Sequence, residues 1–136
     1  MTPWLIALTL TALLQPPGIE LIASDNNSNV EEFRHMVAWT AGEWGTLWRT
    51  HSGVLKPAPS VDLTKRTVVA VFLGSRPTAG YSVEIVGTRR EGKTLVVEWR
   101  EVRPKERMLL AQVLTSPAVI VSIPKFDGDV AFKKVE

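Results

Sequence analysis

Residues 67–85 read TVVAVFLGSRPTAGYSVEI, and this stretch is the most informative part of the chain. Its first part, Thr67–Leu73, is almost entirely apolar, which is typical of a central strand buried on both faces. Its last part alternates, because polar residues separate Tyr81, Val83 and Ile85, and this pattern is typical of a strand with one buried face. The segment between the two parts is longer than a plain two-residue hairpin turn. We therefore expect two strands joined by a specialised loop.

The joining loop is predicted to be stiff. Pro77 fixes its own φ angle and biases the preceding residue toward an extended backbone. A stiff loop loses little conformational entropy on binding, and arginine and tyrosine are frequent in interface hot spots. The residues leave two interpretations open, a contact surface for a protein partner or a structural turn whose tyrosine packs on a helix. The candidate contact residues are Arg76, Pro77, Thr78 and Tyr81, and the loop-shaping glycines are Gly74 and Gly80.

One helix is predicted upstream of this stretch, at about residues 41–52. Thr40 is a suitable N-cap, and Glu43 three residues later completes a capping box. Gly53 is a suitable stop. The stripe expected to face the core consists of Trp44, Leu47, Trp48 and His51.

Alternating or apolar runs predict further strands within residues 31–39, 94–102, 118–123 and 130–135. The run Met108–Leu114 fits a buried strand or a short helix, and we favour a strand. These elements predict an α+β fold dominated by β structure. We expect an antiparallel sheet, or a partly closed barrel or sandwich, with one covering helix.

The N-terminal residues predict a targeting segment. Trp4–Leu14 is apolar and uncharged, and eleven residues suit a signal-peptide core but are too few to span a bilayer. We therefore expect residues 1–18 to direct export to the periplasm or the extracellular space, and not to make an integral membrane protein. An N-terminal core strand or helix is the alternative. Residues 19–29 are expected to be a linker, and residues 30–136 a single domain.

Composition and motifs argue against disulfide, metal, nucleotide and catalytic sites. The 136 residues include no cysteine, which excludes disulfides, thiolate metal sites and a cysteine nucleophile. His35 and His51 lack metal-ligand spacing, and phosphate-binding glycine motifs are absent. Ser75 with His51 is the candidate pair for a hydrolase, but no nucleophile-elbow motif surrounds the serine. We expect no catalytic residue, no metal and no cofactor.

Basic residues gather downstream of the stiff loop, and a solvated face is their simplest interpretation. Nucleic-acid binding is not expected, because the net charge is only +2 and Trp99 is predicted to face the core. An anionic partner surface is the functional alternative. The cluster consists of Arg89, Arg90, Arg100, Arg103, Lys105 and Arg107.

Residues 68–85 resemble the signature of the PrcB-type protease-complex subunit domain, a hydrophobic strand followed by G-x-R-P-T-G-G-Y-S-V-x-I. Ala79 stands where that family usually has glycine. The resemblance extends over about residues 40–125 and implies an exported accessory domain, without catalytic residues, that binds and stabilises a protease. Its oligomeric state is left open. The positions that match the signature are Gly74, Arg76, Pro77, Thr78, Gly80, Tyr81, Ser82, Val83 and Ile85.

A shorter resemblance concerns the loop alone. R-P-T-A-G-Y, residues 76–81, is similar to the N-P-T-T-G-Y loop of chagasin-type inhibitors of cysteine proteases. It implies, as the alternative function, a protease inhibitor that presents this loop to the active-site cleft.

Overall fold

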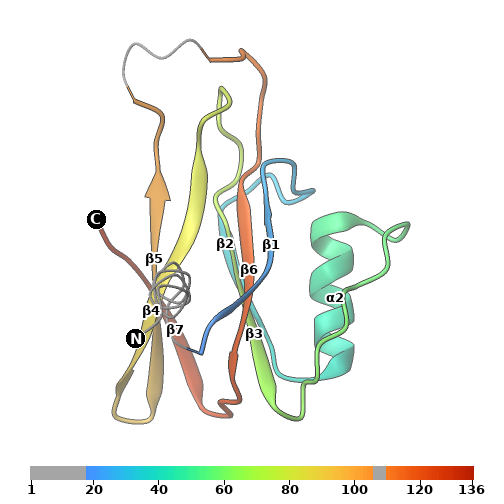
Figure 1. Ribbon diagram of the computed structural model, residues 1–136, viewed down its shortest axis with the longest axis vertical. Coiled ribbons are helices and arrows are strands. Elements are labelled where there is room, and N and C mark those ends of the chain that lie inside the picture. The colour runs from blue at the N-terminus through green and yellow to red at the C-terminus, as the bar shows by residue number, and fades with distance from the viewer. Residues whose placement is uncertain (1–17, 106–109) are drawn as a thin grey trace, which may run out of the picture.

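The computed structural model describes residues 18–105 and 110–136. It is β-dominated, with two sheets of strand order β1-β6-β3-β2 and β4-β5-β7 and one helix, α2. Figure 1 shows three layers, in which the three-stranded sheet, the four-stranded sheet and the helix follow one another. The elements are β1 Glu20–Asp25, β2 Arg34–Ala38, α2 Ala41–Ser52, β3 Arg66–Phe72, β4 Ser82–Glu91, β5 Thr94–Val102, β6 Ala118–Pro124 and β7 Asp129–Lys134.

The helix begins where the capping box predicts. The backbone N–H of Glu43 donates to the Thr40 hydroxyl at 3.2 Å, and the Glu43 carboxylate accepts from the Thr40 N–H at 3.1 Å. At the other end Gly53 has a φ of +78° and donates its N–H to the Arg49 carbonyl. The expected helix over about residues 41–52 is therefore confirmed.

Strand β3 is the central strand that its apolar sequence predicts, because it pairs antiparallel with β2 on one side and β6 on the other. Its alternate side chains enter two different cores. Val69 and Val71 pack between the two sheets, whereas Val68 and Phe72 pack against the helix. The intersheet core also contains Ile85 and Trp99 from the opposite sheet. The fold is therefore a two-sheet sandwich with one helix on its outer face, and not a closed barrel.

The structure corrects the expectation of a linker at residues 19–29. Glu20–Asp25 forms β1, which pairs antiparallel with β6, and Ile19 is buried in the intersheet core. The polar residues of this segment suggested a linker, but they suit an edge strand whose two ends are exposed to solvent. The folded domain thus begins before residue 30. The predicted targeting segment, apart from Gly18, lies outside the described residues.

Two further expectations differ from the structure. The sheet is not purely antiparallel, because β7 runs parallel to β5. The chain leaves β6 in one sheet and turns at residues 125–128 into β7 of the other, which sends β7 in the same direction as β5 (Figure 1). Residues 110–114 form neither strand nor helix, whereas 108 and 109 lie outside the described residues.

Among the residues that the structure describes, no helix combines the length and apolarity needed to span a membrane.

Candidate partner-contact site

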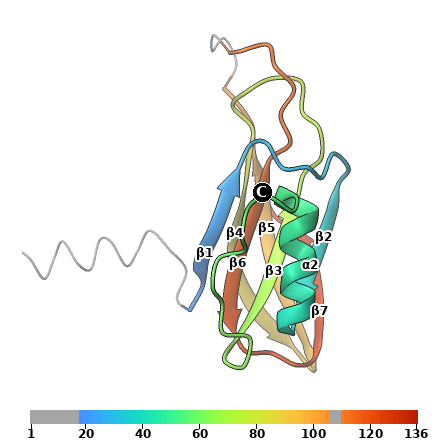
Figure 2. The same cartoon turned by 90° about the vertical axis from the view of Figure 1, so that its right-hand side faces the viewer.

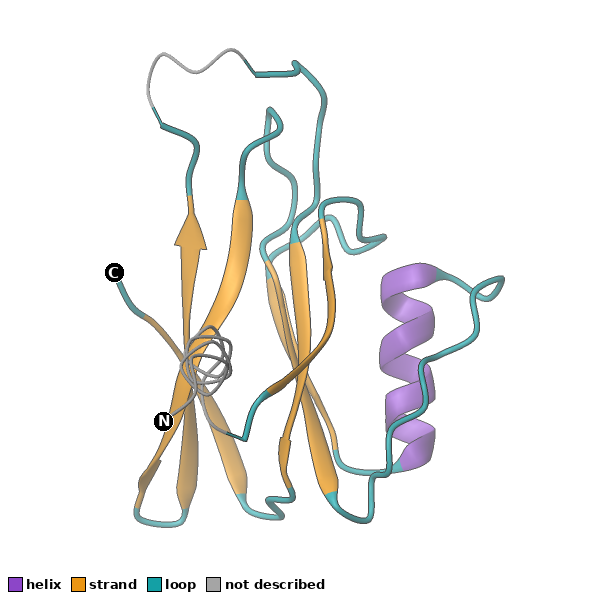
Figure 3. Cartoon of the chain, viewed as in Figure 1, coloured by secondary structure: helices purple, strands orange, loops and turns teal. Residues whose placement is uncertain are grey.

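The loop predicted to contact a partner, residues 74–81, lies at one end of the sandwich; we call it the Arg76 loop. Figure 3 shows it beside the segment that leads into β6. The backbones of Arg76 and Thr115 pair in both directions, at 2.8 and 2.9 Å, and the Ala79 N–H donates to the Ala111 carbonyl at 3.1 Å. The Ser75 N–H donates to the Glu31 carbonyl at 3.0 Å. Backbone bonds to two distant segments therefore hold this loop in one conformation.

The two glycines of the Arg76 loop occupy positions where a side chain would be strained. Gly74 has a φ of +81°, and a Cβ there would lie 2.8 Å from the backbone nitrogen of Phe33. Gly80 has a φ of +96°, and a Cβ there would lie 2.8 Å from Cβ of Pro104. Positive φ favours glycine because other residues clash with their own backbone. These close approaches let the loop lie directly on its neighbours.

Arg76 points back into the end of the sandwich. Its Nε donates to the Glu101 carboxylate at 2.9 Å, and Nη1 donates to the carbonyls of Leu73 and Ser75 at 3.1 and 3.0 Å. The Arg76 side chain is 25% exposed and that of Glu101 only 5%. The guanidinium therefore satisfies a buried carboxylate and two loop carbonyls at the same time, as its fan of N–H donors allows.

The electrostatic environment of Glu101 follows from this contact. The hydrogen bond from Arg76 lowers the pKa of Glu101, although burial acts in the opposite direction. The charges of Arg76, Arg103 and Lys134 lower the pKa of this carboxyl further. Glu101 is thus ionised at neutral pH and forms a buried ion pair with the loop. Glu101 was not among the predicted contact residues, because 25 residues separate it from Arg76 in the chain.

The other predicted contact residues present different amounts of surface. Pro77 is exposed, whereas Thr78 and Tyr81 are partly buried. The Thr78 hydroxyl donates to the Ala79 carbonyl, and the Thr78 carbonyl accepts from the Thr115 hydroxyl. The ring centroid of Tyr81 lies 6.0 Å from the Arg76 guanidinium carbon. Tyr81 therefore lies beside Arg76 and directly before β4, a strand of the sheet remote from α2 (Figure 1).

Two residues that the sequence analysis did not select lie next to this loop. Val113 and Leu114 are 53% and 77% exposed and directly precede Thr115, which pairs with Arg76. Exposed neighbouring apolar side chains often mark a contact surface. Their signal in the sequence was the apolar run Met108–Leu114, which we interpreted as part of a buried strand.

The candidate hydrolase pair is not assembled, and His51 has other partners. Its Nδ1 lies 2.8 Å from the Ser28 hydroxyl, and its Nε2 lies 2.8 Å from the Asp25 carboxylate. Ser28 is buried, whereas the Asp25 side chain is half exposed. A serine hydrolase needs the reverse, an accessible serine and a shielded acid. The trio therefore connects the segment after β1 to the helix. Ser75, whose backbone N–H donates to the Glu31 carbonyl, is not among the hydrogen-bond partners that the structure describes for His51.

The second histidine also lies away from this trio. The ring of His35 stacks on Phe132 at a centroid distance of 4.2 Å, and burial lowers its pKa. Within residues 18–105 and 110–136, no group of three His, Asp or Glu side chains is arranged to hold a metal ion.

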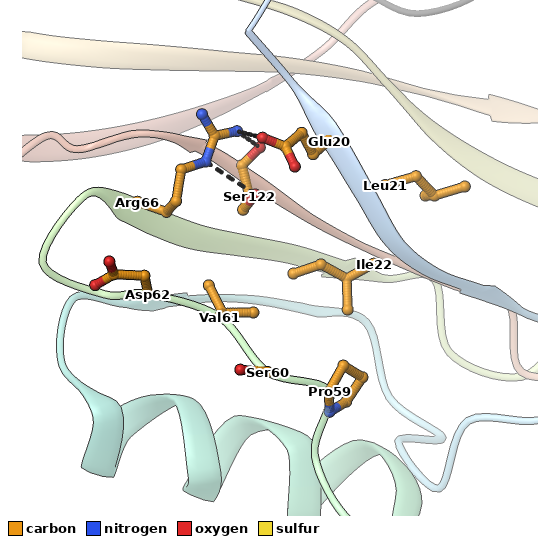
Figure 4. Close-up of a pocket in the computed structure, with 9 residues that line it drawn as sticks. All are labelled: Glu20, Leu21, Ile22, Pro59, Ser60, Val61, Asp62, Arg66 and Ser122. Carbon is orange, nitrogen blue, oxygen red and sulfur yellow. Dashed lines mark hydrogen bonds and ion pairs between the residues drawn. The ribbon is translucent and has the colours of Figure 1, made fainter.

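A separate hollow of about 310 Å³ lies between β1 and residues 59–62, on the helix side of the four-stranded sheet. Figure 4 shows Arg66 reaching across it toward Glu20 and Ser122. Its guanidinium donates to the Ser122 hydroxyl and carbonyl at 3.1 and 2.9 Å and to the Gly18 carbonyl at 2.7 Å. These bonds occupy the guanidinium of Arg66 and connect β6 to the residues before β1. The arginine therefore has a structural role and is not assigned to a ligand.

The comparison with known families agrees with the resemblance noted in the sequence. Residues 67–124 match the family model described as PrcB C-terminal. This range begins in β3, includes the Arg76 loop, β4 and β5, and ends in β6. No curated protein and no solved structure matches the chain. The similarity of the loop to chagasin-type inhibitors stays a sequence-based prediction. Over its central strands and the Arg76 loop, this chain is therefore similar to the PrcB C-terminal family.

Proposed function

We propose that this chain is an exported, non-catalytic accessory domain that binds a protease and stabilises or assembles a secreted protease complex. The contact surface comprises the Arg76 loop together with Val113 and Leu114. One observation carries the proposal: a loop held rigid by backbone pairing lies beside two exposed apolar side chains at one end of the sandwich. The PrcB family match of residues 67–124 supports the protease context.

The geometry suggests different roles for the residues of this surface. Val113 and Leu114 offer apolar area, which contributes about 25 cal/mol for each Å² removed from water. Pro77 and Tyr81 add a stiff backbone and an aromatic ring. Arg76 serves mainly to hold the loop in shape, because Glu101 and two carbonyls occupy its guanidinium. A surface that is already ordered loses little entropy when a partner binds.

The test is capture of the partner by the full chain, followed by reconstitution. The full chain is needed because a version beginning at Val30 would lack β1 and the Ser28–His51–Asp25 contacts. We would cross-link the chain in its native host, identify bound proteins by mass spectrometry, and measure the affinity and thermal stability of the purified pair. The expected result is one protease, whose melting temperature rises when this chain binds.

A matched pair of variants connects that result to the proposed surface. Val113→Ser/Leu114→Ser should weaken binding at least tenfold, the effect expected when hot-spot apolar contacts are lost. Val54→Ser/Leu55→Ser makes the same chemical change in a pair that is even more exposed and lies in the loop after the helix, and it should leave the affinity unchanged. Equal loss in both variants, or capture of no protease, would contradict the proposal. Inhibition of the captured protease at stoichiometric concentration would favour the chagasin-type alternative.

Export is tested separately. We would express the full chain in its host and determine the N-terminus of the mature protein from the culture fluid and the envelope fraction. A mature N-terminus near residue 18, in either fraction, would support the proposed targeting segment. Recovery of the uncut chain from the cytoplasm alone would contradict it.

A further inference from the structure

A second hollow lies at the same end of the sandwich as the Arg76 loop; we call it the Lys134 hollow. It has a volume of about 420 Å³. Its lining residues are Glu101, Arg103, Lys134, Val135 and Glu136. Because Glu101 is also the partner of Arg76, the hollow and the loop share a buried carboxylate. A ligand in the hollow would therefore lie next to the proposed partner-contact surface.

Two cations of the Lys134 hollow are held only loosely. Arg103 Nη2 and Lys134 Nζ lie 3.9 and 3.6 Å from the same oxygen of Glu101, and both distances exceed a hydrogen bond. Arg76 already donates to the other oxygen at 2.9 Å. The side chains of Arg103 and Lys134 are 72% and 53% exposed. Each can thus turn its N–H donors toward an external acceptor without leaving Glu101 unpaired.

The charges favour an anionic ligand. The lining has two cations, Arg103 and Lys134, and two carboxylates, Glu101 and Glu136, and Arg76 from outside the lining pairs with Glu101. The buried carboxylate of Glu101 is neutralised chiefly by Arg76, so the outer part of the hollow is dominated by the other two cations. Glu136 already brings a carboxylate to the lining, and an incoming carboxylate would replace it.

Trp99 adjoins one of the two cations, Lys134, and Phe33 adjoins Trp99, which favours a peptide over a simple anion. The ring of Trp99 lies beneath the surface, with Lys134 Nζ 5.7 Å from its centroid. Phe33 packs on the same ring at a centroid distance of 5.5 Å and is itself half exposed. Exposed aromatic and cationic groups side by side are typical of protein interfaces. Inorganic phosphate would make no use of Phe33.

We propose that the Lys134 hollow binds a carboxylate side chain of an extended acidic segment in the partner protein, through Arg103 and Lys134. The inference rests on the proposed function, because it names the chemistry of the partner at the same end of the molecule. An acidic side chain enters between the two cations, and an apolar neighbour in that segment packs on Phe33. The partner is thereby held at two places, the Arg76 loop and the Lys134 hollow.

A nuclear magnetic resonance titration of the full chain tests this without knowledge of the partner. The probe is a hexaglutamate peptide, with hexaglutamine and inorganic phosphate as comparison ligands. Hexaglutamate should shift the backbone amide signals of Phe33, Arg103, Lys134 and Val135, whereas hexaglutamine should shift none of them. Phosphate should bind these positions at least fivefold more weakly than hexaglutamate.

Variants make the titration specific. Arg103→Gln/Lys134→Gln should weaken hexaglutamate binding about tenfold, since each exposed ion pair accounts for a few-fold change in affinity. Lys133→Gln is the matched control, because Lys133 is an exposed neighbour on β7 whose side chain points to the opposite face of the strand. It should change the affinity by less than twofold. Glu136→Gln should strengthen binding about twofold, because it removes one competing side-chain carboxylate from the lining.

The outcomes separate this inference from the proposed function. Three results would each overturn the carboxylate site. They are amide shifts spread over other basic residues, an equal loss of hexaglutamate affinity in the Lys133→Gln control, and phosphate binding as tight as that of hexaglutamate. A further outcome is that the captured protease binds the Arg103→Gln/Lys134→Gln variant with unchanged affinity and the Val113→Ser/Leu114→Ser variant with reduced affinity. In that case the proposed function stands and this inference fails. If both variants lose the protease while Lys133→Gln retains it, both are supported.

Discussion

Two loops of this protein share several sequence features but have different structural surroundings. The Arg76 loop and the loop that follows the helix, residues 53–60, both begin with a glycine at positive φ and contain proline. Each also has a pair of exposed apolar residues in or beside it, Val113 with Leu114 and Val54 with Leu55. Their backbones are held differently. The Arg76 loop is paired through its own N–H and C=O groups. The helix-exit loop is held at Lys56 and Pro59 by the indole N–H groups of two tryptophans.

The difference shows that proline and glycine alone do not identify a binding loop. The Arg76 loop is fixed to two segments far away in the chain and lies over a buried ion pair. The hydrogen bonds that the structure describes for the helix-exit loop run to the helix before it. We therefore expect changes in the Arg76 loop to affect the whole fold, and changes in the helix-exit loop to stay local.

The largest expected effect is at the first glycine of each loop. Gly74→Ala should lower the free energy of unfolding by about 3 kcal/mol, because a Cβ would meet the backbone of Glu32 and Phe33 in addition to the strain of positive φ. Gly53→Ala should cost only about 1–2 kcal/mol, since its nearest neighbour is the amide nitrogen of the flexible Asn29 side chain at 3.4 Å. Urea unfolding followed by circular dichroism measures both. Equal losses would remove the distinction between the loops.

The next effect concerns the buried ion pair. Arg76→Ala should lower stability by about 2–3 kcal/mol, because Glu101 would lose its hydrogen-bonded partner while staying buried. Arg100→Ala, which removes the exposed ion pair with Glu84, should cost less than about 1 kcal/mol. Thermal unfolding of the two variants provides the comparison. A loss at Arg76 no larger than at Arg100 would mean that the loop is not fixed by Glu101.

The same pair predicts a pH dependence. The pKa of Glu101 is lowered in the folded state, so its contribution to stability is present above the pKa of an unfolded glutamate, about 4.3. That contribution declines as the pH falls from this value through the lower pKa of the folded protein. Stability curves between pH 7 and pH 2 should therefore fall less steeply at the acid end in Arg76→Ala. An unchanged acid slope would show that Glu101 titrates normally.

A smaller effect is expected in the helix-exit loop. Trp48→Phe removes the indole N–H that donates to the Lys56 carbonyl at 3.0 Å and should cost about 1–2 kcal/mol, part of it from lost packing. The Lys56 carbonyl becomes free to bond water, because this loop is exposed. Hydrogen exchange should speed up in residues 53–60 and stay unchanged in the Arg76 loop. Faster exchange in both loops would show that they are coupled.

Much of the fold could be predicted from local patterns. The capping box defined the start of the helix, and the apolar run Thr67–Leu73 predicted a strand buried on both faces. The alternation in residues 94–102 placed Trp99 in the core. The wrong expectations concerned segments whose structure depends on a distant partner. Residues 20–25 form a strand because β6 offers an open edge, and β7 is parallel because of the path taken by the chain.

The candidate site divides in the same way. Local sequence was enough to predict a stiff loop of defined residues between two strands, because proline restricts and glycine widens the range of backbone angles. Tertiary structure alone decided that Arg76 turns inward to Glu101 and that Val113 and Leu114 lie beside it. It also decided that His51 meets Ser28 and Asp25. Backbone angles are set by neighbours in the chain, whereas buried charges and hydrogen bonds depend on groups that only the packing of sheets and helix brings together.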